Sequence, residues 1–172
     1  TLLASSAASD VYKRQDCPGI MVGPESEKSA LIRHAARMFV VGANIETPFM
    51  SVVIRKAYGL GAQAMAGGSF KIPLFTVTWP TGEFGGMGLE GAVKLGYRKE
   101  LEAIKDPKER VASYEKMVAD SYHRGRAVNM ASHFELDDVI DPAETRTWVS
   151  SALKSLPKKS RSGKKRPNID TW

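Results

Sequence analysis

A short run of small residues, Gly59-Leu60-Gly61-Ala62, is the feature of this sequence best suited to chemistry. It closely follows an apolar, β-branched run, residues 49–54, which comes directly after Pro48 and predicts a buried strand. A glycine-bearing turn from such a strand into a helix leaves backbone N–H groups without helical partners, at the positive end of the helix dipole. These groups can stabilise negative charge that develops on an oxygen of a bound molecule. A turn in which the glycines serve only the backbone conformation explains the same residues equally well.

The glycines of this turn do not complete a dinucleotide-binding motif. That motif requires G-x-G-x-x-G, and Ala64 stands where the third glycine would be. No matching acidic residue follows a second predicted strand, so the sequence does not predict a dinucleotide site.

Side chains for acid–base or nucleophilic catalysis are not convincingly placed. Glu83 and the pair Asp137-Asp138 fall in predicted loops. Carboxylates in loops are commonly solvated or accept hydrogen bonds from the backbone at helix starts. We therefore assign none of the three to proton transfer.

Histidine and cysteine are too few and too scattered to predict a metal site. The single cysteine, Cys17, excludes an internal disulfide framework and a multi-thiolate metal site. His34, His123 and His133 form no H-E-x-x-H motif. We expect no metal in this domain and a reducing, cytoplasmic environment.

Alternating short strands and helices surround the glycine turn and predict an α/β fold. The length of 172 residues suits one compact domain. Asp106-Pro107 predicts a helix start, and Asp141-Pro142-Ala143-Glu144 is close to a capping box. The predicted strands cover residues 49–54 and 74–79, a glycine-rich loop covers 80–88, further extended segments cover 128–130 and 136–140, and helices cover 26–41, 59–68, 89–104, 106–124 and 141–156.

The net charge of +6 lies in the carboxyl-terminal tail. Without that tail the chain is electrically neutral, so the body offers no broad face for phosphate groups. The tail has no interleaved aromatic residues on which bases could stack, and we expect residues 158–172 to form a solvated or partner-contacting extension and no nucleic-acid arm. Its basic residues are Lys154, Lys158, Lys159, Arg161, Lys164, Lys165 and Arg166.

The first fifteen residues differ in composition from the rest. They are rich in serine and alanine, and their positive charges, Lys13 and Arg14, follow a weak apolar stretch, which is the reverse of the order in a secretion signal. No run approaches the length of a membrane-spanning helix, and we expect no membrane association. We interpret residues 1–15 as a leader that is not native to the domain, and we expect it to make few contacts with the body.

Six motifs, in a fixed order, resemble the carboxyl-terminal domain of the carboxyltransferase (β) subunits of biotin-dependent acyl-CoA carboxylases. That family includes propionyl-CoA, acetyl-CoA and methylcrotonyl-CoA carboxylases and related decarboxylases. The likeness covers residues 16–170. The motifs are Asp16-Cys17-Pro18-Gly19, Ile32-Arg33-His34-Ala35-Ala36, Arg55-Lys56-Ala57-Tyr58-Gly59, Trp79-Pro80-Thr81-Gly82-Glu83, Met87-Gly88-Leu89-Glu90-Gly91-Ala92-Val93 and the segment from Asp137 to Arg146.

The resemblance implies a crotonase-like (ClpP/crotonase) fold of repeated ββα units, here as a single truncated domain over residues 16–157. It also implies transfer of a carboxyl group from carboxybiotin, held on a separate carrier, to an acyl-CoA. The backbone amides of Gly61 and Ala62 would bind the urea oxygen of biotin, with Tyr58, Gly59, Met87 and Gly88 around them. Ala64 would lie at the position associated in the family with acyl-chain preference.

The same resemblance implies partners. It implies an amino-terminal carboxyltransferase domain that binds the CoA ester, biotin carboxylase and biotin carrier components, and a homo-oligomer of the full subunit. We expect the chain alone to be inactive, as the carboxyl-terminal half of the enzyme. Two alternatives remain open: a biotin-dependent decarboxylase that runs the same chemistry in reverse, and a non-catalytic binding module that uses the basic tail.

Two departures from the family pattern concern loops. The turn reads G-L-G-A where propionyl-type relatives have G-G-A, so it is one residue longer. His133-Phe134 stands where many relatives have a single glycine.

Overall fold

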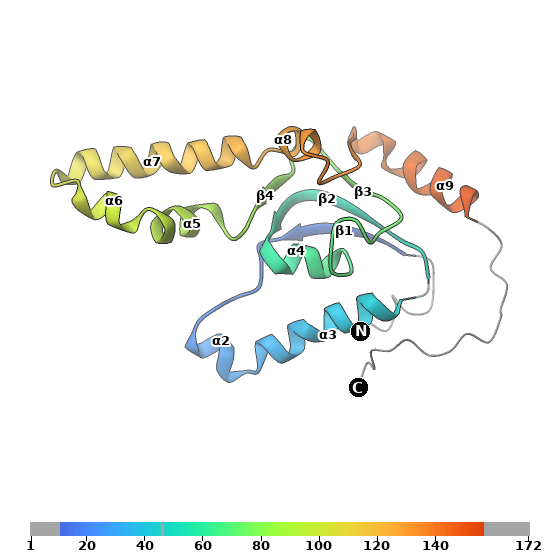
Figure 1. Ribbon diagram of the computed structural model, residues 1–172. Helices are drawn as coiled ribbons and strands as arrows, with labels where there is room; N and C mark the ends of the chain where they lie inside the picture. Colours follow the sequence, from blue (N-terminus) through green and yellow to red (C-terminus); the bar gives the residue numbers. More distant parts are fainter. Residues whose placement is uncertain (1–10, 46, 157–172) are drawn as a thin grey trace.

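A parallel sheet of five strands forms the centre of the chain (Figure 1). The computed structural model describes residues 11–45 and 47–156. Strands β1 (Val11–Cys17), β2 (Phe49–Tyr58), β3 (Thr76–Thr78) and β5 (Asp138–Val139) lie side by side in that order, and β4 (Glu83–Gly85) pairs with the carboxyl end of β2. The α/β class predicted from the sequence is confirmed.

Strand β2 pairs with β1, β3 and β4, and it is longer than predicted. The expected strand ended at Ile54, whereas β2 continues through Arg55-Lys56-Ala57-Tyr58. The extension has a pairing partner that the sequence did not reveal, because β4 pairs in parallel with residues 56–58. Strand β4 itself lies inside the predicted glycine-rich loop, and β3 is shorter than the predicted strand at 74–79.

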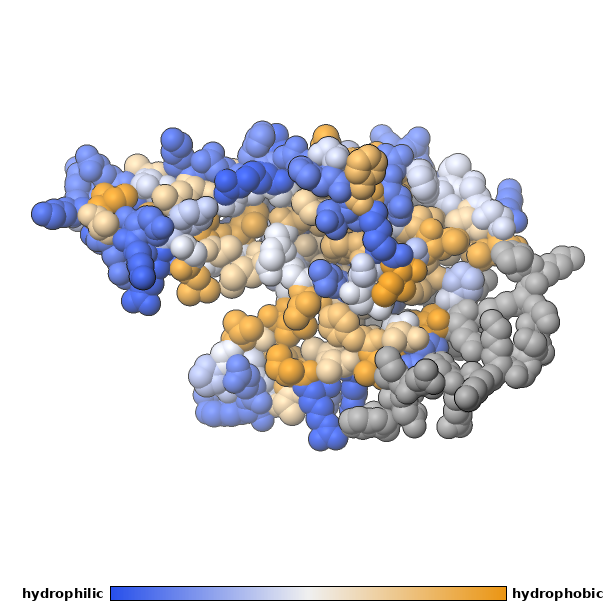
Figure 2. Space-filling view, viewed as in Figure 1, coloured by the Kyte–Doolittle hydropathy of each residue, from blue (hydrophilic) through white to orange (hydrophobic). Residues whose placement is uncertain are grey.

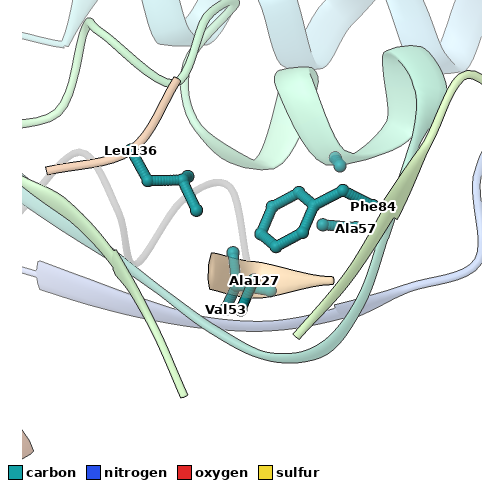
Figure 3. Packing of buried hydrophobic residues seen from close by; sticks show 6 residues of the cluster. Val53, Ala57, Phe84, Ala127 and Leu136 are labelled. Atoms are coloured by element: carbon teal, nitrogen blue, oxygen red, sulfur yellow. The ribbon is translucent and has the colours of Figure 1, made fainter. Parts of the chain in front are cut away.

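The strands pack into two hydrophobic clusters. In the first, Val53 and Ala57 of β2 meet Phe84 of β4, together with Ala127 and Leu136 (Figure 3). In the second, Met50 and Val52 meet residues of β3 and of the last helix, which contributes Trp148, Val149 and Ala152. Successive residues of a strand point to opposite faces, so β2 supplies side chains to both clusters.

The predicted helix over residues 26–41 is two helices, α2 (Pro24–Lys28) and α3 (Leu31–Asn44). They are separated at Ala30, which has a left-handed φ of 56°. The expected cap at Ser26 is therefore wrong. Helix α2 begins instead after Gly23, with proline in its first turn.

An arm of three helices extends from the sheet (Figure 1). The predicted helix over 89–104 is divided at Tyr97 into α5 (Leu89–Gly96) and α6 (Arg98–Ala103). Helix α7 (Pro107–Arg124) returns along α5 and α6, as Figure 1 shows. The local signals for α7 are confirmed, because the Asp106 carboxylate accepts from the N–H of Lys108 at 3.0 Å and Gly125 is the C-cap.

The carboxyl-terminal part of the described chain contains α8 (Ala127–Ser132), a 3₁₀ turn η1 (Pro142–Glu144) and α9 (Thr145–Ser155). The extended segment predicted at 128–130 is wrong. Ala127 at the start of α8 is fully buried in the first cluster, and packing decides the conformation of this short apolar run. The predicted capping box is confirmed, since Asp141 accepts from Ala143 and Glu144 accepts from the N–H of Asp141.

The prediction that the first fifteen residues make few contacts is wrong for residues 11–15. They pair in parallel with β2, and the buried Gln15 donates to the Ser51 hydroxyl at 2.6 Å. The edge of β2 has backbone donors and acceptors that need partners, and β1 satisfies them. Residues 1–10 and the basic tail at 158–172 lie outside the described residues.

No helix within residues 11–45 and 47–156 has the length and apolar character needed to cross a membrane.

Candidate active site

The turn between β2 and α4 (Gly59–Met65) has the geometry that the glycines predict. Gly59, the first residue of α4, has a φ of +56°, which lies outside the right-handed helical region and favours glycine. Gly59, Leu60 and Gly61 form the first helical turn, where backbone N–H groups have no partner within the helix, and Ala62 is the first residue whose N–H faces a carbonyl of its own helix, that of Tyr58. The partial positive charge of the N–H groups in this first turn suits an anionic oxygen.

Two loops approach this turn closely. A Cβ on Gly59 would lie 2.5 Å from the carbonyl oxygen of Gly86, so only glycine permits the contact between the turn and the loop before α5. A Cβ on Gly61 would lie 2.9 Å from both the Sγ of Cys17 and the carbonyl carbon of Gly19. The turn therefore packs between the end of β1 with the residues that follow it and the loop that follows β4.

Helix α4 is anchored in the core by its alanines. Ala62 is fully buried in the first hydrophobic cluster, and Ala64 is buried as well. The Ala64 methyl group thus packs inside this domain. By contrast, Leu60 is 61% exposed.

Met87 and Gly88 are placed at the start of α5, with Gly88 as its N-cap. The pairing of Tyr58 with Gly85 brings this segment beside the turn, and Met87 remains partly exposed. The residues predicted to surround the biotin site therefore come from two neighbouring segments, the β2–α4 turn and the β4–α5 loop.

Tyr58 is buried, and its hydroxyl donates to the Glu83 carboxylate at 3.0 Å. Burial, followed by this hydrogen bond, raises the pKa of Tyr58 far above its ordinary value. Sequence analysis named Tyr58 but missed its partner. Glu83 falls in a loop that carried no strand signal, and the register that pairs it with Lys56 is visible only in the folded chain.

The other candidate carboxylates support the backbone. Asp137 accepts from the N–H of Thr76 at 2.6 Å, and Asp138 accepts from the N–H of Val139 at 2.7 Å. The Asp137 bond holds the start of β5 beside β3, whereas the Asp138 bond lies within β5. Over the described ranges 11–45 and 47–156, no three residues of the types His, Cys, Asp and Glu gather as metal ligands would.

Comparison with known proteins assigns the family. The family model described as "Carboxyl transferase domain" matches residues 14–169. The chain belongs to this family. The match begins within β1, so Arg14 and Gln15 are part of the carboxyl transferase domain.

Curated relatives of this carboxyl transferase domain act on acyl-CoA esters. The chain is 35% identical over 160 residues to a propionyl-CoA carboxylase, carboxyltransferase subunit, of Haloferax mediterranei, covering 90% of this chain and 30% of that protein. It is 34% identical over 160 residues to the methylmalonyl-CoA carboxyltransferase 12S subunit of Propionibacterium freudenreichii subsp. shermanii, covering 90% of this chain and 29% of that protein. The chain thus spans about 30% of the length of these relatives.

Solved structures give the same fold. A single-chain, multi-domain long-chain acyl-CoA carboxylase is 50% identical with a TM-score of 0.76, over 87% of this chain and 15% of that one. A transcarboxylase 12S structure, a hexamer with methylmalonyl-coenzyme A bound, is 32% identical with a TM-score of 0.75, over 92% of this chain and 30% of that one. The crotonase-like fold expected from the resemblance is confirmed.

Proposed function

We propose that this carboxyl transferase domain forms the carboxybiotin side of an acyl-CoA carboxyltransferase. The observation that carries the proposal is the first turn of α4, where the backbone amides of Gly59, Leu60 and Gly61 have no partner within the helix and lie beside the β4–α5 loop. The family assignment supplies the reaction class, and the geometry supplies groups suited to an anionic oxygen.

The N–H of Gly61 would donate to the urea oxygen of biotin and, together with the N–H of Ala62 at the next position of the turn, stabilise the negative charge that develops there. When bound, carboxybiotin supplies the carboxyl group and afterwards a ring nitrogen that takes the α proton of the acyl-CoA. The chain therefore needs no general base of its own in this domain. That agrees with the roles of Glu83, Asp137 and Asp138, which are engaged in hydrogen bonds within the fold.

The small residues of this segment suit biotin. A Cβ at Gly86 or at Gly88 would meet no atom within 4 Å, so the backbone between β4 and α5 is open to an approaching ring. Met87 and Leu60 are exposed apolar side chains on the two segments that flank this space. Gly59 and the buried Tyr58 would support the biotin site from within the domain. The Ala64 methyl group is buried, so this residue does not identify the preferred acyl group.

We propose that an amino-terminal carboxyltransferase domain supplies the acyl-CoA side. Apolar side chains are exposed on the arm and on α3, including Leu95, Val111 and Ile32. Figure 2 shows a hollow between the arm and the part of the molecule formed by α2 and α3, with hydrophobic surface on both sides of it. Hydrophobic surface of this kind commonly marks an interface with another domain or subunit.

The remaining components follow from the same proposal. We propose a biotin carboxylase and a biotin carrier as partners, a homo-oligomer of the full subunit, and a cytoplasmic location. The hexameric transcarboxylase 12S neighbour supports the oligomer. The direction of the reaction has a second candidate, because a methylmalonyl-CoA decarboxylase subunit alpha of Propionigenium modestum is 31% identical over 160 residues.

The test uses the complete subunit that carries this chain. It should transfer the carboxyl group of a carboxylated biotin carrier to acetyl-, propionyl- or methylcrotonyl-CoA, and it should release carbon dioxide from malonyl- or methylmalonyl-CoA only when biotin is present. A folded subunit that does neither with any of these esters would contradict the proposal. The isolated chain should be inactive in both assays.

A further inference from the structure

Two tyrosine–carboxylate pairs lie between the glycine turn and the helical arm. The Tyr58 hydroxyl donates to Glu83 at 3.0 Å, and the Tyr122 hydroxyl donates to Glu90 at 2.7 Å. The four residues come from four elements, namely β2, β4, α7 and α5. The first pair joins two strands of the sheet at the turn, and the second joins two helices of the arm.

The two pairs are joined through the end of α7, because the N–H of Phe84, next to Glu83 in β4, donates to the carbonyl oxygen of Gly125, three residues after Tyr122, at 2.8 Å. The pKa of Tyr58 is raised by burial, by its bond to Glu83 and also by the nearby Tyr122. The pKa of Tyr122 is raised first by its bond to Glu90 and then by burial, and Glu83 contributes as well. Lys56 faces the same cluster, because its charge adds to the hydrogen bond from Tyr122 in lowering the pKa of Glu90. Hydrogen bonds thus run from β2 to β4, from β4 to the end of α7 and from α7 to α5.

Strand register explains why Tyr58 reaches Glu83. In the parallel pair of β2 and β4, Lys56 lies opposite Glu83. Residues 56 and 58 project from the same face of the strand, so the hydroxyl of Tyr58 returns to the carboxylate beside Lys56. Ala57 and Phe84 project from the opposite face, into the first hydrophobic cluster.

The cluster ties together the two segments that would border carboxybiotin. Tyr58 is the last residue of β2, directly before Gly59 and the amides of α4. Glu90 is the second residue of α5, two positions after Gly88. Movement of α5 away from the turn would have to break the Tyr122–Glu90 hydrogen bond or carry α7 with it, and α7 is tied at its end to β4 by the Phe84–Gly125 hydrogen bond.

We propose that the Tyr58–Glu83 and Tyr122–Glu90 pairs form a clamp that fixes the separation between the 59–62 turn and the start of α5, which makes Tyr58 a positioning residue of the carboxybiotin site. This inference rests on the proposed function. A buried hydroxyl is costly unless it is hydrogen-bonded, whereas phenylalanine would fill the same space without needing a partner. The hydroxyl group of Tyr58 therefore serves the position of β4, while its ring fills the space that phenylalanine would fill.

The kinetic test uses the complete subunit with free biotin and methylmalonyl-CoA. Tyr58→Phe should lower turnover at least about tenfold, because small displacements of positioning groups have large effects on rate. It should also raise the KM for biotin and leave the KM for the CoA ester unchanged. A change that only lowered the fraction of folded enzyme would leave both KM values unchanged, and that result would overturn the clamp.

Two further variants sharpen the kinetic test. Glu83→Gln keeps an oxygen that can accept a hydrogen bond from Tyr58, so this variant should retain most of the wild-type turnover. Glu83→Ala removes the acceptor and should lower turnover as Tyr58→Phe does. Tyr97→Phe removes a tyrosine hydroxyl elsewhere in the arm and should behave as the wild type does. Equal losses for Glu83→Gln and Glu83→Ala would overturn the clamp.

A second measurement does not depend on activity. Amide hydrogen exchange of residues 59–65 and 87–96 should become faster in Tyr58→Phe and in Tyr122→Phe, while residues 145–155 of α9 should be unaffected. Unchanged exchange in both variants would overturn the clamp. Faster exchange in a subunit whose wild type is inactive would overturn the proposed function alone. Tyr122 is half-buried, so its variant decides the question even if Tyr58→Phe does not fold.

Discussion

The backbone of Gly67 lies directly against Gly42 of α3, and a Cβ on Gly42 would lie 2.7 Å from the Cα of Gly67. This contact lets α3 pack closely against the segment that follows α4, and so it helps to hold α4 in place. Glycine inside a helix normally weakens it relative to alanine. Here close packing reverses that preference.

Gly42→Ala should therefore lower the free energy of unfolding by about 1–3 kcal/mol, the usual cost of overpacking a tight interior. Gly91→Ala in α5 is the matched control, because its Cβ would meet only the Met87 Cε, at 3.8 Å. The control should raise stability by up to about 1 kcal/mol. Urea unfolding measures both, and equal effects of the same sign would refute the contact.

Phe134→Gly should stabilise the protein. Phe134 has a left-handed φ of +59° directly after the C-cap of α8, and its side chain is 81% exposed. A non-glycine residue in this conformation costs about 1–2 kcal/mol, and an exposed ring loses few contacts when it is removed. We expect a gain of about 1 kcal/mol in thermal or urea unfolding. Phe134→Ala keeps the Cβ and should show no comparable gain, and an equal gain would argue against backbone strain.

Tyr58→Phe should reduce the loss of stability at alkaline pH. Burial and the bond to Glu83 raise the pKa of Tyr58. A group whose pKa is higher in the folded state contributes stability that is fully present below its unfolded pKa, about 10 for tyrosine, and that is lost as the pH rises toward the folded value. Unfolding free energies of wild type and variant should run parallel from about pH 7 to 9 and converge above about pH 10. Parallel curves throughout would contradict the shift.

Gly61→Pro in the complete subunit should lower turnover about 10²- to 10³-fold, the usual effect of removing one donor to a developing oxyanion. Both Gly61→Pro and Gly61→Ala add a Cβ at the position 2.9 Å from Gly19, but only proline removes the N–H. The difference between the two variants therefore reports the amide itself. If they were equally impaired, the turn would be needed for packing alone.

Glu83→Gln and Asp138→Asn should each change turnover by less than about tenfold, because a side chain that carries no proton can lose its charge without stopping the reaction. Steady-state turnover of the complete subunit measures this. Abolished turnover in Glu83→Gln with the fold intact would replace the amide mechanism with side-chain acid–base catalysis.

Signals between near neighbours in the chain were sufficient for several elements. Helix α7 has Asp106 as its N-cap, Pro107 as its first residue and Gly125 as its C-cap, as predicted. The Asp141–Glu144 capping box also forms as predicted. The glycines at 59 and 61 predicted a tight turn into a helix, which the structure contains. The six motifs also led to the correct family. These features depend on backbone conformation and hydrogen bonds within a few residues, which the residue types determine directly.

Pairing between distant segments was decided only by the tertiary structure. Residues 55–58 become strand because β4 lies beside them, and residues 11–15 become strand because the other edge of β2 needs a partner. Residues 128–130 become helix because Ala127 is fixed in the core. The Tyr58–Glu83 bond joins residues 25 positions apart, through a register that no local pattern encodes. Burial and pairing over such separations arise only when the whole chain packs, because each partner is defined by the others.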